Sequence, residues 1–236
     1  MTEPTPEPTD VRAVLAVEAT GGMDTARIET LGDGIFAIVI TLLVLELKVP
    51  EVPHDALPAV VLPGLLLAMG PKFVSWLLSF VMVAVYWQAH HVQYNLIRRV
   101  DRPLIWLNML FFLAVAIIPF TAGLLGSYPS TQLPVVLYGV NLIVVNLSLA
   151  WHWHHASNRH WLVDEQLDDA AVETAYRRIL LPPAVYTVAI ALSFLDPRLA
   201  IVLYALMPIA YIIPTPVNRF FNAPYERQPK APPHTP

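Results

Sequence analysis

The chain contains no cysteine, which excludes disulfide bonds, thiolate metal sites and cysteine nucleophiles. Charged residues are also scarce: Asp, Glu, Lys and Arg make up 14% of the sequence, the net charge is -4, and there is no basic run. These absences argue against nucleic acid as a partner. The first ten residues, MTEPTPEPTD, have neither a basic nor an apolar segment, so we expect no cleavable signal peptide and a first helix that stays in the membrane.

Hydrophobic residues are abundant instead, at 56% of the 236 residues, which is more than an average soluble domain contains. Runs of them predict an all-α membrane protein with six transmembrane helices, at about residues 30–47, 72–96, 103–125, 133–150, 180–195 and 199–217. We expect this membrane domain to cover residues 27–219, between a mobile N-terminal tail at residues 1–26 and a disordered C-terminal tail at residues 220–236. No internal duplication is visible, so one chain holds one copy of the unit.

Prolines predict where these helices are interrupted. We expect an irregular loop over residues 50–63, although the apolar stretch at residues 60–70 can lie at the membrane interface. Pro119 is expected to kink the third span. Pro182 and Pro183 suit the first turn of the fifth span, which would follow a separate soluble helix at residues 163–178.

Basic residues predict the orientation of the spans. Six spans place both termini on one side, where eleven of the fourteen Lys and Arg residues lie: Arg12, Arg27, Arg98, Arg99, Arg102, Arg159, Arg177, Arg178, Arg219, Arg227 and Lys230. Only Lys48, Lys72 and Arg198 lie on the other side. The positive-inside rule therefore predicts that both termini are cytoplasmic.

The first span lies within residues 27–48, RIETLGDGIFAIVITLLVLELK, an apolar segment with charges near both ends. At about 1.5 Å per residue it can cross a hydrocarbon core of roughly 30 Å. A lipid-facing carboxylate costs roughly 2.5–3.5 kcal/mol at a helix centre and less toward the ends, so Asp33 is expected to face protein or water. One face of the helix carries Gly34, Ile38, Thr41 and Leu45, spaced i, i+4, i+7 and i+11.

Arg27, Asp33 six positions later and the following GIFAIVITLLVLEL resemble the first-helix signature of the transmembrane protein 175 family, the lysosomal potassium channels and their prokaryotic relatives. In that family an arginine precedes a Phe-Ser-Asp triplet, which opens the pore-lining helix. Here the triplet reads Leu31, Gly32, Asp33, so only the aspartate and the arginine match. The segments YWQAHH and WLNMLFFL and the pair Pro119-Phe120 extend the resemblance to about residue 125.

The resemblance implies a homotetramer in which the first helices surround one potassium pathway, with no cofactor, no metal site and no enzymatic activity. It implies that Ile38 forms a hydrophobic constriction and Thr41 a threonine layer that favours potassium, with Leu42 and Leu45 as further pore residues. The sequence contains no TVGYG filter, so selectivity would come from side-chain rings and pore width and be modest. The spacing alone leaves an alternative: Thr41 bonds back to the carbonyl of Ala37, and the apolar residues simply pack.

Six residues toward the cytoplasmic ends of the first three helices form a candidate structural network. They are Arg27, Asp33, Trp87, His90, His91 and Asn108. Arg27 and Asp33 are about 9 Å apart along a helix, too far for a simple pair, so both need other partners. We expect the network to satisfy the carboxylate and fix the tilt of the pore helix, while a proton relay or pH sensor is the competing interpretation.

The remaining candidates carry weaker signals. His152, His154, His155 and His160 are dense but lack a recognised metal-ligand spacing, so we interpret them as residues of a headgroup-level belt. Glu46 and Lys48 at the outer mouth either concentrate cations or extend their charges to water. Two other functions remain open. A proton-coupled or other secondary transporter would use Asp33 and the membrane histidines, whereas a membrane hydrolase lacks a diagnostic constellation.

Overall fold

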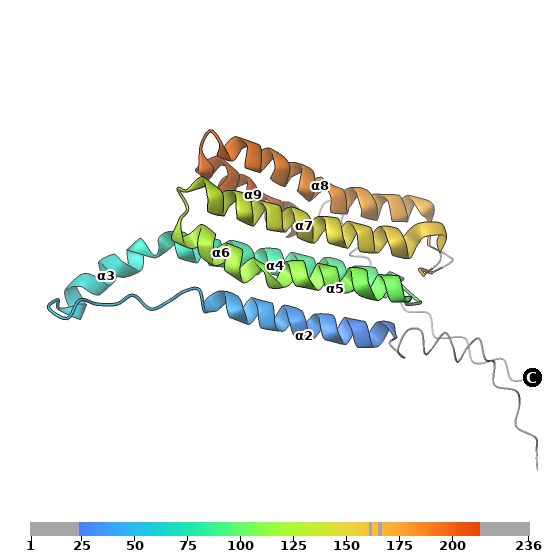
Figure 1. Ribbon diagram of the computed structural model, residues 1–236, viewed down its shortest axis with the longest axis horizontal. Coiled ribbons are helices and arrows are strands. Elements are labelled where there is room, and N and C mark those ends of the chain that lie inside the picture. The colour runs from blue at the N-terminus through green and yellow to red at the C-terminus, as the bar shows by residue number, and fades with distance from the viewer. Residues whose placement is uncertain (1–23, 161, 165–166, 213–236) are drawn as a thin grey trace, which may run out of the picture.

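The computed structural model describes residues 24–160, 162–164 and 167–212 and is all-helical apart from one isolated antiparallel bridge between Ile97 and Val163 (Figure 1). Its helices are α2 (Thr25–Val44), α3 (Pro58–Ala68), α4 (Gly70–Leu96), α5 (Arg102–Ala116), α6 (Ile118–Ser127), α7 (Gln132–Ser157), α8 (Asp169–Ser193) and α9 (Pro197–Ile212), with a 3-10 turn at Asn158–His160. Most of the predicted N-terminal tail, the whole C-terminal tail and the end of the sixth span lie outside the described residues. Because α2 begins at Thr25, the last residues assigned to the N-terminal tail belong to this helix.

Successive long helices run in alternating directions, so the start of α2 and the start of α8 lie at the same end of the bundle (Figure 1). The helix α2 forms one edge and packs on α4, α5 and α6. At the opposite edge α8 packs on α7 and α9. A continuous hydrophobic core joins these layers and includes Phe36 of α2, Tyr138 of α7 and Tyr204 of α9.

Aspartate side chains fix the starts of three helices. Asp24 accepts a hydrogen bond from the main-chain N–H of Arg27 at 2.8 Å, and Asp101 accepts one from Leu104 at 2.9 Å. Asp168 caps α8 in the same way. Each aspartate satisfies an N–H group that has no partner within its helix, and its negative charge suits the positive end of the helix dipole.

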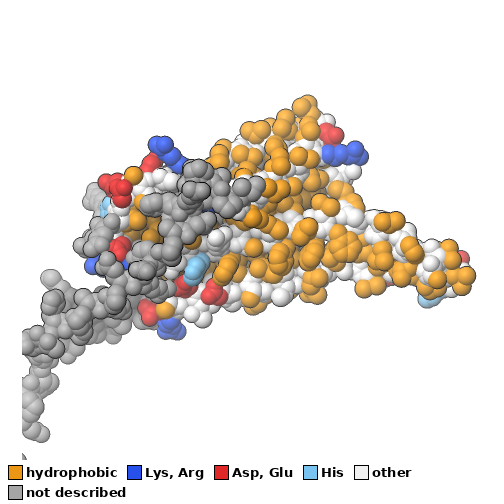
Figure 2. Space-filling model, turned by 180° about the vertical axis from the view of Figure 1, so that it is seen from behind, with side chains coloured by type: hydrophobic (Ala, Val, Ile, Leu, Met, Phe, Trp, Pro, Cys, Tyr) orange, Lys and Arg blue, Asp and Glu red, His pale blue; other side chains and the backbone are white. Residues whose placement is uncertain are grey.

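Three segments of the described chain are long and apolar enough to cross a membrane: Gly70–Leu96, Arg102–Ser127 and Gln132–Ser157. Each exceeds the roughly 20 residues that a bilayer core requires. Figure 2 shows hydrophobic side chains over much of the bundle and charged side chains gathered toward its ends. This distribution is that of a membrane protein.

Polar residues inside the bundle bond to one another instead of facing lipid. The hydroxyl groups of Ser79 and Tyr138 are 3.0 Å apart, and the amide of Asn146 donates to the hydroxyl of Tyr86 at 2.8 Å. These bonds join α4 to α7 at positions where unsatisfied polar groups would be costly.

The third apolar segment breaks at the predicted place. The helix α5 ends at Ala116 and α6 begins at Ile118, with Pro119 in its first turn. Proline lacks the N–H group that would continue the helix ladder, and its ring crowds the preceding turn. The third span is therefore interrupted beside Pro119, the residue at which a kink was predicted.

The division of residues 163–195 into a soluble helix and a separate span was wrong. A single helix, α8, passes through Pro182 and Pro183. Pro182 cannot donate to the carbonyl of Arg178 four residues earlier, but the hydroxyl of Tyr211 on α9 donates to that carbonyl instead, at 2.5 Å. A neighbouring helix thus satisfies the backbone group that the proline releases, which allows α8 to continue.

The irregular loop expected over residues 50–63 is also corrected at its end, because α3 begins at Pro58. Proline is favourable in the first turn of a helix, so Pro58 starts this helix instead of preventing it. The helix α3 projects from the end of the bundle and buries none of its residues within the chain (Figure 1).

Candidate functional site

The helix α2 has one buried and one exposed face. Its buried residues are Ile28, Gly32, Phe36, Val39 and Leu43, which recur at the spacing of a helical stripe. All four candidate pore residues lie on the exposed face: Thr41 is exposed, and the exposed fractions are 60% for Ile38, 42% for Leu42 and 66% for Leu45. Because α2 is an edge helix, this largely apolar stripe is left uncovered by the part of the chain that the structure describes (Figure 1).

Gly32 lets the buried face of α2 approach α4 and α5 closely. A Cβ atom at this position would lie 3.1 Å from His90 Cε1 and 3.1 Å from Phe112 Cζ, tighter than ordinary contact. The imidazole of His90 therefore takes up the space beside Gly32, where the family signature has serine. By contrast, Gly34 has open space beside it on the exposed side of the helix.

Two residues one turn apart on α2 bind two residues one turn apart on α4. The indole Nε1 of Trp87 donates to Asp33 Oδ1 at 2.8 Å. His91 Nδ1 lies 2.9 Å from Glu29 Oε1, and its ring stacks on the ring of Trp87 with centroids 5.9 Å apart. Glu29 was not among the predicted residues, although its i, i+4 spacing from Asp33 places both carboxylates on one side of the helix.

His90 belongs to a different, buried group. Its Nε2 lies 2.9 Å from Asn108 Oδ1, and because an amide oxygen only accepts, the imidazole donates. The ring is stacked on Phe111 with centroids 5.4 Å apart. The predicted network is therefore split in two: His90 and Asn108 join α4 to α5 in the core, while Asp33, Trp87 and His91 lie nearer the surface.

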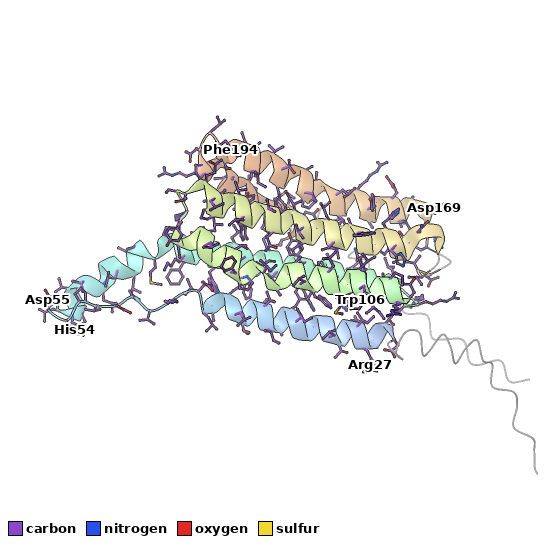
Figure 3. All side chains as sticks on the ribbon, in the orientation of Figure 1. Arg27, His54, Asp55, Trp106, Asp169 and Phe194 are labelled. Atoms are coloured by element: carbon purple, nitrogen blue, oxygen red, sulfur yellow. The ribbon has the colours of Figure 1, made fainter. Side chains whose placement is uncertain are left out.

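Arg27 is not brought into either group. It lies at the start of α2, at the edge of the bundle, and is exposed (Figure 3). Its main-chain N–H bonds to Asp24, and no hydrogen bond or ion pair of its side chain is found within residues 24–160, 162–164 and 167–212. Within the described residues, Arg27 is therefore separate from the other members of the predicted network.

His152 is a second buried histidine, so its predicted place in a headgroup-level belt was wrong. Its Nδ1 donates to Gln93 Oε1 at 2.9 Å, and its Nε2 accepts from the hydroxyl of Tyr94 at 3.2 Å. The signal was present in the sequence, because the buried positions of α7 include Tyr138, Leu142, Val145, Leu149, His152 and Ala156. This spacing of three or four residues places His152 on the core side of the helix.

The other histidines of that cluster are dispersed. His155 Nε2 lies 2.9 Å from Asp101 Oδ2, and His160 Nε2 donates to the carbonyl of Leu167 at 3.0 Å. His154 lies beside the ring of Tyr176. No group of three or more His, Cys, Asp and Glu residues that could hold a metal ion occurs in the described part of the chain.

The chain is similar to known proteins in sequence and in overall fold. The family profile described as endosomal/lysosomal potassium channel TMEM175 matches residues 27–119. A potassium channel of Chamaesiphon minutus is 34% identical over 188 residues, which cover 78% of this chain and 92% of that relative. A potassium channel of Streptomyces collinus is 28% identical over 195 residues, which cover 80% of this chain and 91% of that relative. The crystal structure of a lysosomal potassium-selective channel TMEM175 homolog from Chamaesiphon minutus has a TM-score of 0.71 at 30% identity and covers 84% of this chain and 98% of that one.

Proposed function

The chain belongs to the family of the endosomal/lysosomal potassium channel TMEM175 and is a cation channel, not an enzyme; from this premise we propose how it conducts ions. Four copies form a homotetramer in the cell membrane, each with six transmembrane helices and cytoplasmic termini. Potassium ions pass along the axis where the four α2 helices meet. The channel uses no cofactor and prefers potassium to sodium modestly.

The observation that carries this proposal is the uncovered stripe on α2. A helix at the edge of a bundle that exposes Ile38, Leu42 and Leu45 has to cover them with lipid or with another chain. Thr41 and Gly34 lie in the same stripe, and neither is needed on a purely lipid-facing surface. Closed rotational symmetry brings one such stripe from each subunit to a common axis, which is the arrangement that the relatives' channel function favours.

Thr41 is suited to contact a cation. Its hydroxyl donates to the carbonyl of Ile38 at 2.8 Å, one residue away from the Ala37 carbonyl that the packing alternative named. This bond uses the only hydrogen of the hydroxyl, so the oxygen lone pairs remain free to accept or to coordinate. Four such oxygens around the axis would replace part of the hydration shell of a potassium ion.

Ile38 is the constriction in this proposal. It lies one turn from Thr41 toward the cytoplasmic side, and its side chain is 60% exposed in the single chain. A ring of four branched apolar side chains closes a narrow pore by excluding water, and it opens when the helices move apart or the ring becomes wet. The contacts of Asp33 and Glu29 with α4 would hold α2 at the tilt that sets this ring.

Ion flux into liposomes that contain the purified protein tests the proposal. We expect electrogenic potassium flux down its gradient that exceeds sodium flux under the same conditions. Replacing Thr41 with Ala should move the potassium-to-sodium ratio toward one, because the ring of oxygen ligands is lost. Bi-ionic reversal potentials measure this ratio.

Thr187→Ala is the matched control, because this threonine of α8 also bonds to a carbonyl of its own helix, at 2.8 Å, but lies on the far side of the bundle. Its reversal potential should equal that of the wild type. An unaltered reversal potential in the Thr41 variant would remove Thr41 from the selectivity mechanism. Potassium flux that requires a counter-moving proton would favour the proton-coupled transporter instead.

A further inference from the structure

A partly open cavity of about 250 Å³ lies among α4, α7, α8 and α9. None of its described lining residues belongs to α2, so it is separate from the proposed ion pathway. Most of its wall is apolar, and the part nearest the middle of the bundle is formed by Met82, Val85, Tyr186 and Met207. The hydroxyl of Tyr186 is directed to the sulfur of Met82, at 3.8 Å, so this part of the wall presents mainly hydrocarbon.

One charged residue lines the cavity. Arg178 projects from α8 and lies over the ring of Tyr211, with its guanidinium carbon 5.0 Å from the ring centroid. No Asp, Glu or Lys side chain of the described residues lines the cavity with it. A guanidinium group offers five N–H donors in a planar fork, which fits the oxygens of a phosphate group.

The same wall contains a buried amide that can donate further. Gln93 is only 4% exposed, and its Oε1 is paired with His152 Nδ1 at 2.9 Å. Its Nε2 has no hydrogen-bond partner within the part of the chain that the structure describes. A buried donor of this kind is costly unless it finds an acceptor, and an acceptor entering the cavity would supply one.

The polar end of the cavity lies toward one end of the bundle and the apolar part lies deeper, in the order in which a lipid places its head and its acyl chains. Gln93 lies in the last turn of α4 and Arg178 in the first half of α8, so both lie toward the predicted cytoplasmic end of the bundle. Met82 and Met207 lie deeper along their helices. The arrangement matches an amphiphile whose charged head lies at the cytoplasmic surface, where anionic lipids are concentrated.

We propose that this cavity binds an anionic phospholipid of the surrounding bilayer, with its phosphate on Arg178 and one acyl chain along Val85 and Met207. The guanidinium selects the negative head, the amide of Gln93 adds a donor at the same end, and the hydrocarbon wall excludes free phosphate as the natural occupant. The site requires only that the bundle is embedded in a membrane. It does not depend on where the ion pathway runs.

Native mass spectrometry of the full chain in neutral detergent tests this site, with phosphatidylglycerol and phosphatidylcholine offered in equal amounts. The wild type should retain phosphatidylglycerol about tenfold better than phosphatidylcholine. A tenfold preference corresponds to about 1.4 kcal/mol, which one charge-assisted contact can supply. Arg178→Gln should abolish the preference. Arg177→Gln should keep it, because Arg177 is 79% exposed and pairs with Glu173 at 2.7 Å, outside the cavity.

Equal retention of the two lipids by the wild type, or equal loss of preference in the two arginine variants, would overturn the proposal. So would glycerol phosphate that competes as well as the intact lipid, because the apolar wall would then contribute nothing. If Arg178→Gln does not fold, the lipid preference of the wild type still tests the site.

A second experiment uses the wild type and a variant of the apolar wall. Phosphatidylglycerol with a photoreactive acyl chain should label peptides of α4 and α9, and Val85→Phe should reduce that labelling. Labels confined to α2 or α5 would overturn the site.

Discussion

Replacing Ile38 with Asn should raise the basal potassium current by about tenfold or more. In the proposed pore the substitution exchanges four apolar side chains for four amides that bind water. Each 1.4 kcal/mol by which the substitution lowers the free energy of water and ions in the constriction raises their occupancy there about tenfold. Ile38 is 60% exposed in the single chain, so the substitution removes little packing within the subunit and acts mainly by wetting the ring. Single-channel or whole-liposome current at a fixed potassium gradient measures the effect.

Val188→Asn is the matched control for this variant. Val188 is 55% exposed on α8, at the far side of the bundle from α2, so the same polar side chain enters a comparable exposed position. Its current should match the wild type. If the Ile38 variant folds and assembles but conducts no more than this control, Ile38 does not form the gate.

Replacing Asp33 with Ala should destabilise the docking of α2 by about 1.5–3 kcal/mol, the usual contribution of a hydrogen bond to a charged group. The bond from Trp87 Nε1 to Asp33 Oδ1, at 2.8 Å, joins α2 to α4 directly. We therefore expect a lower melting temperature and less assembled tetramer, with the remaining tetramer still conducting. Size-exclusion chromatography and thermal unfolding measure both quantities.

A double-mutant cycle separates this bond from other effects of the substitution. Trp87→Phe removes the same bond from the other partner. The double variant should therefore lose little more stability than either single variant. Asp55→Ala, which changes an exposed carboxylate in the loop before α3, should have no effect on assembly. An Asp33 variant that assembles normally but no longer conducts would show that Asp33 acts on ions, as the carrier interpretation requires.

The two faces of α2 were predictable from the sequence because a helical period alone separates Ile38, Thr41 and Leu45 from the residues that pack. The period could not say what lies opposite the exposed face, since it describes one helix and contains no information about the helix's partners. That step came from the resemblance to a channel family. The tetramer and the ion pathway remain predictions on the same ground.

The errors came from proline and histidine, whose effects depend on neighbouring helices. Pro182 and Pro183 would end an isolated helix, but Tyr211 from α9 bonds to the carbonyl that Pro182 releases, and no local pattern contains that contact. His90 and His91 are adjacent in sequence, yet one is buried against Asn108 and the other pairs with Glu29 near the surface. Only the contacts that α4 makes with α5 through His90 and with α2 through His91 distinguish them.

Blockade of a single introduced cysteine tests most directly whether the exposed face of α2 lines the ion pathway. The chain has no cysteine of its own, so Leu45→Cys, at a position 66% exposed, gives one reactive thiol near the proposed outer mouth. Leu133→Cys is the control, at a position 64% exposed in the first turn of α7. After quantitative reaction with a bulky cationic thiol reagent, we predict that potassium flux into liposomes falls to a small fraction in the Leu45 variant and is unchanged in the control. Undiminished flux in the fully labelled Leu45 variant would contradict conduction along α2.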